Sequence, residues 1–559
     1  MNSPEPVAWA SMAPQERIEA LDVVRGFALL GIFLMNIEYF NRSTSGIGEG
    51  MPLGLTGLDW WASWFIAYFV QGKFWTIFSL LFGMGFAVML TRAQQAERDF
   101  IAPYLRRILG LAVFGALHYI FLWSGDILFS YAMAAGALLV LLYGQWRPIL
   151  LAVLLLVAVG LTPDMEPVFA IAGGLGFVSL LALYVRAERR VKLFGRSFPL
   201  FSFILLAVGS IGVLAAVVLW LLPDAPTEPR VPVTIACIIL LILGSLSARF
   251  HDPAALRQLR LGVTLYTFMA LTMTLGGVGQ YFQARAAASA ATTGPPAAAT
   301  QPASGAKGVV EASEKKSAKT EAQEAAEQKV ERAARLSRRQ EEIRNEVKVL
   351  SSGSYLDTVE FHAGKFPKKV AFDAGFSTVL LGMFLLGSWF VRSGVMLNTK
   401  EHLPLFRKLA LYGLSIGIGL GLLGSLIAVS HVAGDDLDGF QIGRGLATLG
   451  NLPACLGYVG LVVLMLHSNS IWSRIRVLAP MGRMTLTNHL TQSVICAFYF
   501  FGWGLGHWGM GRAWQVVFVA LVFSLQLAFS HWWLARFRYG PMEWLWRGFT
   551  YRQIPPMRL

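Results

Sequence analysis

Charged residues are scarce in this sequence. They make up 14% of the 559 residues, against about 25% in a typical soluble domain. Hydrophobic residues make up 55%, and the mean hydropathy is +0.55. This balance excludes a soluble globular enzyme and predicts an all-α, polytopic integral membrane protein.

Cysteines are scarcer still, and the three present show no pattern. Cys237, Cys455 and Cys496 each lie inside an apolar run, without the paired spacing of a disulfide framework or a zinc site. We interpret them as small packing residues. We therefore expect no disulfide and no metal site, and nothing in the sequence indicates a bound cofactor.

Acidic residues are fewer than basic ones, 33 against 47, which gives a net charge of +14. In a soluble protein such an excess would suggest nucleic acid as a partner. Here the basic residues cluster in short loops between apolar runs. We therefore attribute the charge to membrane topology and to contact with anionic lipid headgroups, and expect membrane lipids rather than nucleic acid as partners.

Fourteen apolar runs of about 17 to 25 residues are candidate membrane spans. Basic and acidic loops alternate between them, which predicts that both termini are cytoplasmic. No small-residue cleavage site follows the first run, so we expect it to stay as an anchor rather than be removed as a signal peptide. The predicted spans are 22–40, 64–91, 105–123, 127–143, 148–162, 166–186, 201–222, 232–248, 261–282, 372–393, 406–430, 446–467, 485–504 and 514–535.

A long segment without apolar runs separates the ninth and tenth spans. Residues 283–310 are rich in Ala, Thr, Pro and Gly, which predicts a flexible linker. Residues 311–350 are rich in Glu, Ala, Lys and Arg and predict a helix, either a solvated spacer or one that pairs with a partner helix. The chain would then consist of an N-terminal transmembrane bundle (1–282), an extracytoplasmic linker with a charged helix (283–352) and a C-terminal transmembrane bundle (353–559).

The first span carries polar residues at both ends. Asp22 and Arg25 are three residues apart and should pair at the cytoplasmic face, because a charge at the bilayer centre costs about 2.5 to 3.5 kcal/mol. Asn36 and Glu38 follow about 17 to 20 Å farther along the axis, at roughly 1.5 Å per residue. They are expected near the opposite face, so this one helix presents polar groups at both ends of a path across the membrane.

Several motifs lie in order along nearly the whole chain. They are Arg17-x-x-x-Leu21-Asp22-x-x-Arg25-Gly26-Phe27-Ala28 through Asn36, Gly72-Lys73-Phe74 with Phe78-Ser79-Leu80-Leu81-Phe82-Gly83, His118 with Trp123-Ser124-Gly125-Asp126-Ile127-Leu128, Gly353-Ser354-Tyr355, Gly482-Arg483-Met484 with Leu486-Thr487-Asn488, and Gly540-Pro541-x-Glu543-Trp544-Leu545-Trp546-Arg547. With these motifs the sequence resembles the YeiB-like family of bacterial inner-membrane proteins, which carries a domain of unknown function. The resemblance implies a multi-pass protein of the bacterial inner membrane.

Over its first helices this family is similar to a wider group of membrane acyltransferases that includes heparan-alpha-glucosaminide N-acetyltransferase. These proteins move acyl groups from cytoplasmic acyl-CoA onto sugars across the membrane. In one branch an Arg and a catalytic His stand eleven positions apart, where this chain has Arg25 and Asn36. The heparan branch also has Asn there and uses a His in the outer loop, whereas here no His lies between Arg25 and His118. The resemblance implies acyl-CoA as the donor substrate and an envelope glycan or small molecule as the acceptor.

Acyl transfer to a hydroxyl or amine needs a general base near the outer face, and His118 and Glu38 are the candidates. His118 lies in the outer half of the third span, and Asp126 follows eight residues later across a Trp-Ser-Gly turn, where it could orient the imidazole. The alternative is a buried histidine bonded to a neighbouring backbone or hydroxyl group. Glu38 is either a base or an outer-face carboxylate in contact with water.

Three further residues are candidates for substrate binding near the two faces. Arg25 would bind the phosphates of CoA, or simply pair with Asp22 and hold the positive end inside. Asn36 would bind the substrate near the base. Lys73 would pair with an outer carboxylate, or extend its amine outward to the membrane surface.

The thirteenth span carries a polar stripe, because Thr485, Asn488 and Gln492 fall at positions i, i+3 and i+7. Lipid offers such side chains no partner, so they face other helices or a water-filled cavity. Asn488 and Gln492 therefore either line a substrate path or join neighbouring helices.

The resemblance implies a membrane acyltransferase, and within it we expect His118 to be the base, Asp126 to orient it and Asn36 to bind the substrate. The alternative is a transmembrane transporter of a small solute, which commonly has two repeated halves. We find no convincing internal repeat in this sequence. A third interpretation, an assembly protein that holds a partner through the 311–350 helix, has the least support. A homo-oligomer is compatible with all three interpretations.

Overall fold

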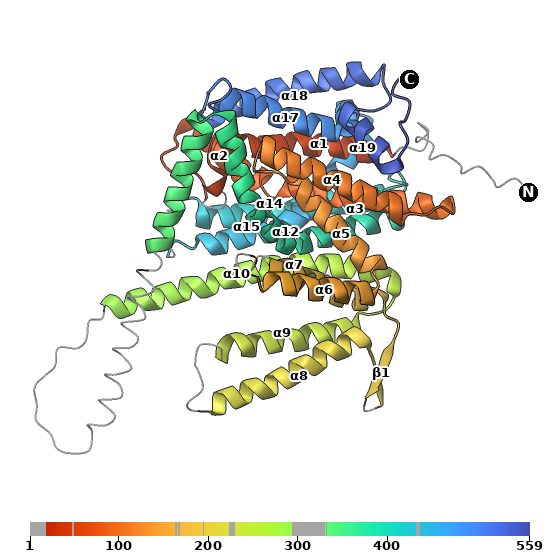
Figure 1. The fold of residues 1–559 in the computed structure, drawn as a ribbon, viewed down its shortest axis with the longest axis vertical. Helices are drawn as coiled ribbons and strands as arrows, with labels where there is room; N and C mark the ends of the chain where they lie inside the picture. Colours follow the sequence, from red (N-terminus) through yellow and green to blue (C-terminus); the bar gives the residue numbers. More distant parts are fainter. Residues whose placement is uncertain are drawn as a thin grey trace, which may run out of the picture.

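The computed structural model describes residues 18–46, 50–162, 165, 168–193, 195–222, 230–292, 330, 333–431 and 437–559. Apart from one antiparallel hairpin, β1 (Arg190–Leu193) with β2 (Arg196–Pro199), the regular structure of these residues is helical. Most helices lie side by side in a bundle (Figure 1). The predicted all-α class is confirmed.

The described helices follow one another along the chain. They are α1 (Glu19–Asn36), α2 (Gly57–Phe65), α3 (Lys73–Gln95), α4 (Ile101–Phe121), α5 (Leu128–Tyr143), α6 (Trp146–Gly160), α7 (Val168–Arg186), α8 (Leu200–Leu221), α9 (Arg230–Arg249), α10 (Arg257–Thr292), α12 (Tyr355–Arg392), α13 (Leu403–Lys408), α14 (Leu414–Ala428), α15 (Phe440–Leu466), α16 (Ala479–Arg483), α17 (Thr485–Phe500), α18 (Arg512–Leu534) and α19 (Pro541–Tyr551), with 3-10 turns η2 (Ile37–Phe40), η3 (Thr44–Gly46), η5 (Ala254–Leu256) and η7 (Ile471–Leu478) and π-helical turns η4 (Ile66–Val70) and η6 (Leu409–Gly413). Residues 333–352 are also helical.

Each of the fourteen predicted spans falls on a helix. Within the described residues, ten helices are long and apolar enough to cross a membrane, and three more are apolar but shorter, namely Leu128–Tyr143, Trp146–Gly160 and Val233–Arg249. The remaining predicted span corresponds to α17, which has 16 residues. The chain is therefore a multi-pass membrane protein, and the predicted number of fourteen exceeds the ten helices that satisfy both criteria.

The centre of the bundle is packed closely through glycines on α3 and α12. A Cβ atom on Gly387 would lie 1.9 Å from the carbonyl oxygen of Leu80, and one on Gly83 would lie 2.1 Å from that of Phe384. Small residues let transmembrane helices approach closely, which strengthens their van der Waals packing where the hydrophobic effect contributes little. These two contacts place α12 directly against α3 in the core.

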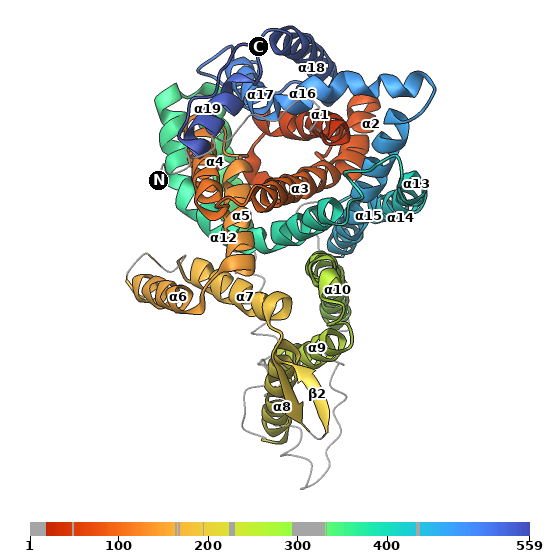
Figure 2. The same cartoon turned by 90° about the vertical axis from the view of Figure 1, so that its right-hand side faces the viewer.

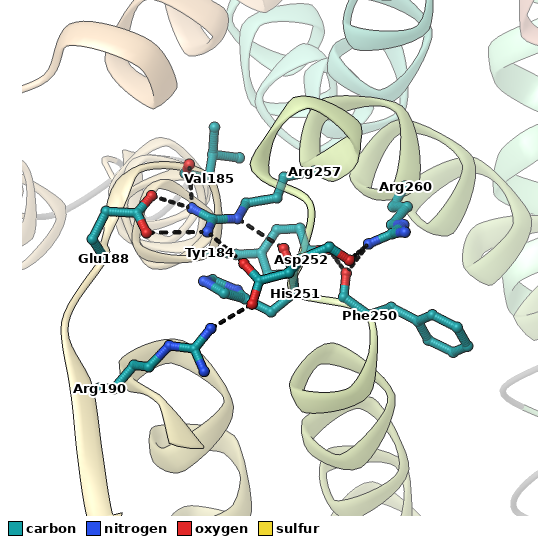
Figure 3. Close-up of polar contacts among 9 residues, drawn as sticks. All are labelled: Tyr184, Val185, Glu188, Arg190, Phe250, His251, Asp252, Arg257 and Arg260. Atoms are coloured by element: carbon teal, nitrogen blue, oxygen red, sulfur yellow. Dashed lines mark hydrogen bonds and ion pairs between the residues drawn. The ribbon is translucent and has the colours of Figure 1, made fainter. Parts of the chain in front are cut away.

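The helices α8 and α9 form an arm that projects from the bundle. The helices α6, α7 and α10 lie at the level between this arm and the rest of the bundle (Figures 1 and 2). Arg257, at the start of α10, is buried and joins the end of α7 to the segment between α9 and α10. Its Nη1 donates to Glu188 (2.8 Å), its Nε to the His251 carbonyl (2.9 Å) and its Nη2 to Asp252 (3.4 Å), and Arg190 pairs with the same Asp252 (Figure 3). Since a rigid guanidinium can serve several acceptors at once, we interpret this cluster as structural.

The helical residues 333–352 dock on the bundle, at the end opposite the C-terminus (Figure 1). Glu346 is fully buried there, and its carboxylate accepts hydrogen bonds from the hydroxyls of Ser43 (2.8 Å), Thr44 and Ser45 and lies 3.4 Å from Lys365 Nζ. Burial opposes ionisation, but these hydrogen bonds and the lysine outweigh it and hold the pKa of Glu346 below its usual value. The end of the predicted 311–350 helix is therefore anchored on the bundle, whereas residues 311–329 and 331–332 of that prediction lie outside the described residues.

Candidate active site

Three buried side chains, two from neighbouring positions of the chain and one from far along it, form one hydrogen-bonded row. His118 Nδ1 lies 2.8 Å from Asp126 Oδ1, and His118 Nε2 lies 2.8 Å from Ser493 Oγ. His118, Asp126 and Ser493 have exposed fractions of 2%, 4% and 2%. An ionised carboxylate can only accept, so Nδ1 donates to Asp126. In the neutral imidazole Nε2 then accepts from the hydroxyl of Ser493, whose Oγ also lies 3.3 Å from a second acceptor, the carbonyl oxygen of His489.

The hairpin between α4 and α5 positions the histidine and the aspartate. His118 lies in the last turn of α4, where its carbonyl oxygen accepts from the amide of Trp123 (2.9 Å). The two helices meet at Gly115, where a Cβ atom would lie 2.3 Å from the nitrogen of Phe129. Asp126 Oδ2 accepts from that same Phe129 nitrogen (2.8 Å), so the start of α5 fixes the carboxylate while Oδ1 holds the imidazole.

The third member comes from α17, which also contributes a second histidine. His489 and Ser493 are four residues apart and therefore share one face of the helix. The rings of His489 and His118 lie 5.5 Å apart between centroids. His489 Nε2 is buried and has no hydrogen-bond partner among the described residues. An unsatisfied imidazole nitrogen therefore lies beside the His118 row.

Glu543, on α19, fixes the start of α17. Its carboxylate accepts from the backbone amides of Leu486 (2.6 Å) and Thr487 (3.1 Å) and from the Thr487 hydroxyl (2.5 Å). A carboxylate at a helix N-terminus satisfies free amides and interacts favourably with the helix dipole. This contact gives the Gly-Pro-x-Glu motif at Gly540 a structural role, since it sets the position of the helix that carries Ser493.

An outer layer covers the turn that carries Asp126. The indole of Trp123 donates to the carbonyl of Tyr39 (3.2 Å) and stacks on Phe40 with 4.2 Å between centroids. On the same turn, Ser124 Oγ lies 3.2 Å from Thr44 Oγ1, in the segment that Glu346 holds. The turns η2 and η3 that follow α1 thus cover this turn, and the docked 333–352 helix holds η3 through Glu346.

The arrangement has the connectivity of a Ser-His-Asp triad, in which the carboxylate orients the imidazole and the imidazole accepts the serine proton. Such a row turns a weak hydroxyl nucleophile into one that can attack an acyl carbon. Among the described residues, no group of three or more His, Cys, Asp or Glu side chains is arranged to hold a metal ion. The predicted contact between His118 and Asp126 is present, with Ser493 as a third partner.

Two other predicted residues lie outside this row. Glu38 pairs with Arg42 (2.9 Å) and with Arg512 (2.6 Å), so two guanidinium groups hold its carboxylate. Asn36 is half-buried, and its side chain makes no hydrogen bond with the described residues. The expected pocket in which Asn36 meets His118 and Asp126 is therefore not formed by direct contact.

The two predicted basic residues have local partners. Lys73 is 1% exposed, and its Nζ donates to the carbonyl of Tyr68 (2.5 Å). The predicted acidic partner and the predicted extension outward are both wrong for Lys73, because the π-helical turn η4 before it supplies a carbonyl oxygen. Arg25 pairs with Asp22 at 3.1 Å, as the three-residue spacing predicts.

The predicted polar stripe of α17 faces α18. Asn488 Nδ2 donates to Ser530 Oγ (3.0 Å), and Gln492 Nε2 donates to Gln526 Oε1 (2.9 Å). Gln526 in turn donates to the carbonyl of Asn488 (3.0 Å). These bonds correspond to the helix-joining alternative, whereas the substrate-path alternative for Asn488 and Gln492 stays a prediction.

Sequence reasoning missed Ser493. A single serine in an apolar helix is unremarkable, and 375 residues separate it from His118. The available signal was its position four residues after His489, which places both on one face of the predicted span. The sequence does not show that α17 packs against α4, so this spacing could not be connected with His118.

Comparisons with known proteins point to a single family. Residues 390–553 match the family described as "Protein of unknown function (DUF418)". The chain is 32% identical to "Uncharacterized protein YeiB" of Escherichia coli (strain K12) over 194 residues, which cover 34% of this chain and 48% of that protein. These matches support a YeiB-like DUF418 family for this chain. The DUF418 match includes His489, Ser493 and Glu543. It begins after His118 and Asp126 and does not include them.

Another relative of this chain is similar over both halves of the site. "Uncharacterized protein YxaH" of Bacillus subtilis (strain 168) is 25% identical over 555 residues, which cover 97% of this chain and 96% of that protein. A 39.9 kDa uncharacterized protein from the amylase 3′ region of Bacillus acidopullulyticus is 39% identical over 132 residues, 24% of this chain and 36% of its own length. No solved structure matches the chain significantly.

Proposed function

We propose that this protein is a membrane acyltransferase that works through a serine-bound acyl intermediate. The observation that carries the proposal is the buried row of Ser493, His118 and Asp126, with two distances of 2.8 Å. The resemblance of the first helices to membrane acyltransferases supports the same class of reaction. Acyl-CoA is the proposed donor, and an envelope glycan or small molecule is the proposed acceptor.

In the first half-reaction, Ser493 Oγ attacks the thioester carbonyl of the donor while His118 Nε2 accepts the hydroxyl proton. The C–O bond forms, the C–S bond breaks, and His118 returns the proton to the leaving thiolate. In the second half-reaction the acceptor hydroxyl or amine loses its proton to His118, and its oxygen or nitrogen bonds to the acyl carbon. The ester bond to Ser493 Oγ then breaks, and His118 returns the proton to that oxygen. Asp126 holds Nδ1 and stabilises the imidazolium in both halves.

The proposal includes a topology in which the donor and acceptor approach from opposite sides. Fourteen spans with both termini in the cytoplasm, in the bacterial inner membrane, place Arg25 at the inner end of α1 and His118 at the outer end of α4. Arg25 and the basic loops near it would attract the CoA phosphates. The thioester arm would then reach His118 from the cytoplasmic side, and the acceptor would arrive from outside.

The test is capture of the acyl group on the protein. Purified full-length protein is incubated with acetyl-CoA labelled in the acetyl group, and the label retained after denaturation is measured. The wild type should retain label, S493A and H118A should not, and S124A should behave as the wild type, because Ser124 lies on the same turn outside the row. Retention of label by S493A at the wild-type level would overturn the proposal.

Transport of a small solute is the second candidate, and Lys73 favours it. A buried lysine follows a π-helical turn and Gly72, whose φ is +85°, so the helix is interrupted beside an intramembrane charge. Interrupted helices often carry the binding site of a transporter. A solute that raises the unfolding temperature of wild type and S493A but not of K73M would favour transport. The same response in all three proteins would exclude Lys73 from the binding site.

A further inference from the structure

A cavity of about 550 Å³ opens between α4 and α19, at the end of the bundle where the chain ends. Its volume falls within the range of about 300 to 1,000 Å³ that is usual for small-molecule sites. The walls are mostly apolar and aromatic. The lining residues are Arg106, Leu109, Trp544, Leu545, Gly548, Phe549, Arg552 and Ile554.

Contacts between α4 and the C-terminal segment hold the walls in place. Arg106 Nε donates to the carbonyl of Thr550 (2.8 Å), and the Arg107 guanidinium lies 3.9 Å above the ring of Trp546. The Trp546 indole donates in turn to the Arg107 carbonyl (3.0 Å). The cavity is therefore formed by packed elements rather than by a loose chain end.

The cavity continues into an apolar stripe on α4. Leu105, Leu109, Val113, Leu117 and Phe121 follow one another at intervals of four residues and are 43% to 56% exposed. Such a row of exposed apolar side chains on a spanning helix faces lipid tails. Since Leu109 belongs to both the stripe and the cavity, an acyl chain can run from one into the other.

The charge at this site is positive. Arg106 and Arg552 are its charged lining residues, and the segment 535–559 contains five arginines and one acidic residue, Glu543. That carboxylate is already bonded to the start of α17. The excess positive charge is complementary to an anionic group at the level of the lipid headgroups.

We propose that this cavity binds an anionic phospholipid of the leaflet on that side. One acyl chain lies between Leu109 and Phe549 and continues along α4, and the phosphate lies between Arg106 and Arg552. The headgroup level fits α19, whose aromatic and basic residues suit the membrane interface. This site is separate from the Ser493 row, so its test is independent of acyl transfer.

The test compares phosphatidylglycerol with phosphatidylcholine carrying the same acyl chains. Full-length protein is exchanged into mixed vesicles of the two lipids, extracted in detergent and analysed by native mass spectrometry for retained lipid. The wild type should retain phosphatidylglycerol about tenfold more than phosphatidylcholine, equivalent to about 1.4 kcal/mol. Equal retention of the two lipids by the wild type would overturn the proposal.

Two variants and two matched controls locate the site. R552Q removes one lining charge, and G548F fills the cavity, because a Cβ atom on Gly548 meets only one atom, at 3.9 Å. R536Q makes the same change of charge on another arginine of the C-terminal segment, and G136F adds the same ring where a Cβ atom meets nothing within 4 Å. Loss of the lipid preference in R552Q and G548F alone supports the site, and its persistence in both refutes it. Thermal unfolding in detergent checks that each variant is folded. If one of R552Q and G548F does not fold, the result for the other decides the test.

Discussion

Replacing Asp126 by asparagine should abolish acyl transfer while leaving the fold in place. Phe129 N donates to one oxygen of the Asp126 carboxylate, and His118 Nδ1 lies 2.8 Å from the other. A backbone amide can bond only to the carbonyl oxygen of the new side chain, so the new NH₂ group must face His118. The imidazole must then carry its proton on Nε2, and it can no longer accept from Ser493.

The size of the effect follows from this tautomer change. In serine enzymes of this connectivity the same substitution lowers kcat by about 10⁴, which corresponds to about 5.4 kcal/mol in the activation barrier. We expect a loss of that order for D126N here, whereas the volume and the Phe129 hydrogen bond are kept. Stability should therefore fall by no more than about 1 to 3 kcal/mol, the cost of a perturbed buried hydrogen bond.

The assay is the initial rate of label uptake from acetyl-CoA by D126N and wild type at pH 7, with thermal unfolding measured in parallel. S124A serves as a control on the same turn. A D126N protein that is folded and acquires label at more than about a tenth of the wild-type rate would refute the reasoning, because a proton on Nε2 blocks base catalysis.

Three other predictions concern the scaffold. E543Q should lower the free energy of unfolding by about 1 to 2 kcal/mol, because the charge at the start of α17 is lost; chemical denaturation in detergent measures this. G387A should destabilise the protein by about 1 to 3 kcal/mol, because the added methyl group overpacks the contact with α3. G375A should leave the stability unchanged, because a Cβ atom there meets nothing within 4 Å, and thermal unfolding of both variants measures the difference. The pKa of Glu346 is lowered from 4.5, so the stability that it contributes is complete above pH 4.5 and is lost as the pH falls through the lowered value. A spin label at the exposed Ser337 should therefore become mobile only in that acidic range.

Sequence periodicity predicted the helices well, because a membrane span needs a long apolar run and little else. The contact between His118 and Asp126 and the pair formed by Asp22 and Arg25 were also predictable. Each joins residues at most eight positions apart, across one turn or along one helix. Local geometry alone determines such contacts.

What the sequence could not reveal depends on contacts between distant segments. Ser493 joins His118 only when α17 packs against α4, and Glu346 is buried only because residues 43–45 supply hydroxyls and amides for its carboxylate. Lys73 needs no carboxylate because a π-helical turn exposes the Tyr68 carbonyl. Composition predicts a charged helix over 311–350, but it gives no sign that Glu346, in the last turns of that helix, is buried against the bundle.

The central claim is that His118 activates Ser493, and a fluorophosphonate probe tests it without knowledge of the natural substrate. The full-length protein is treated with the probe in detergent, digested and analysed by mass spectrometry for the modified peptide. We expect the adduct on Ser493 in the wild type and a strong loss of it in H118A and D126N. Folded wild-type protein with no adduct on Ser493, or equal labelling in H118A, would contradict the account.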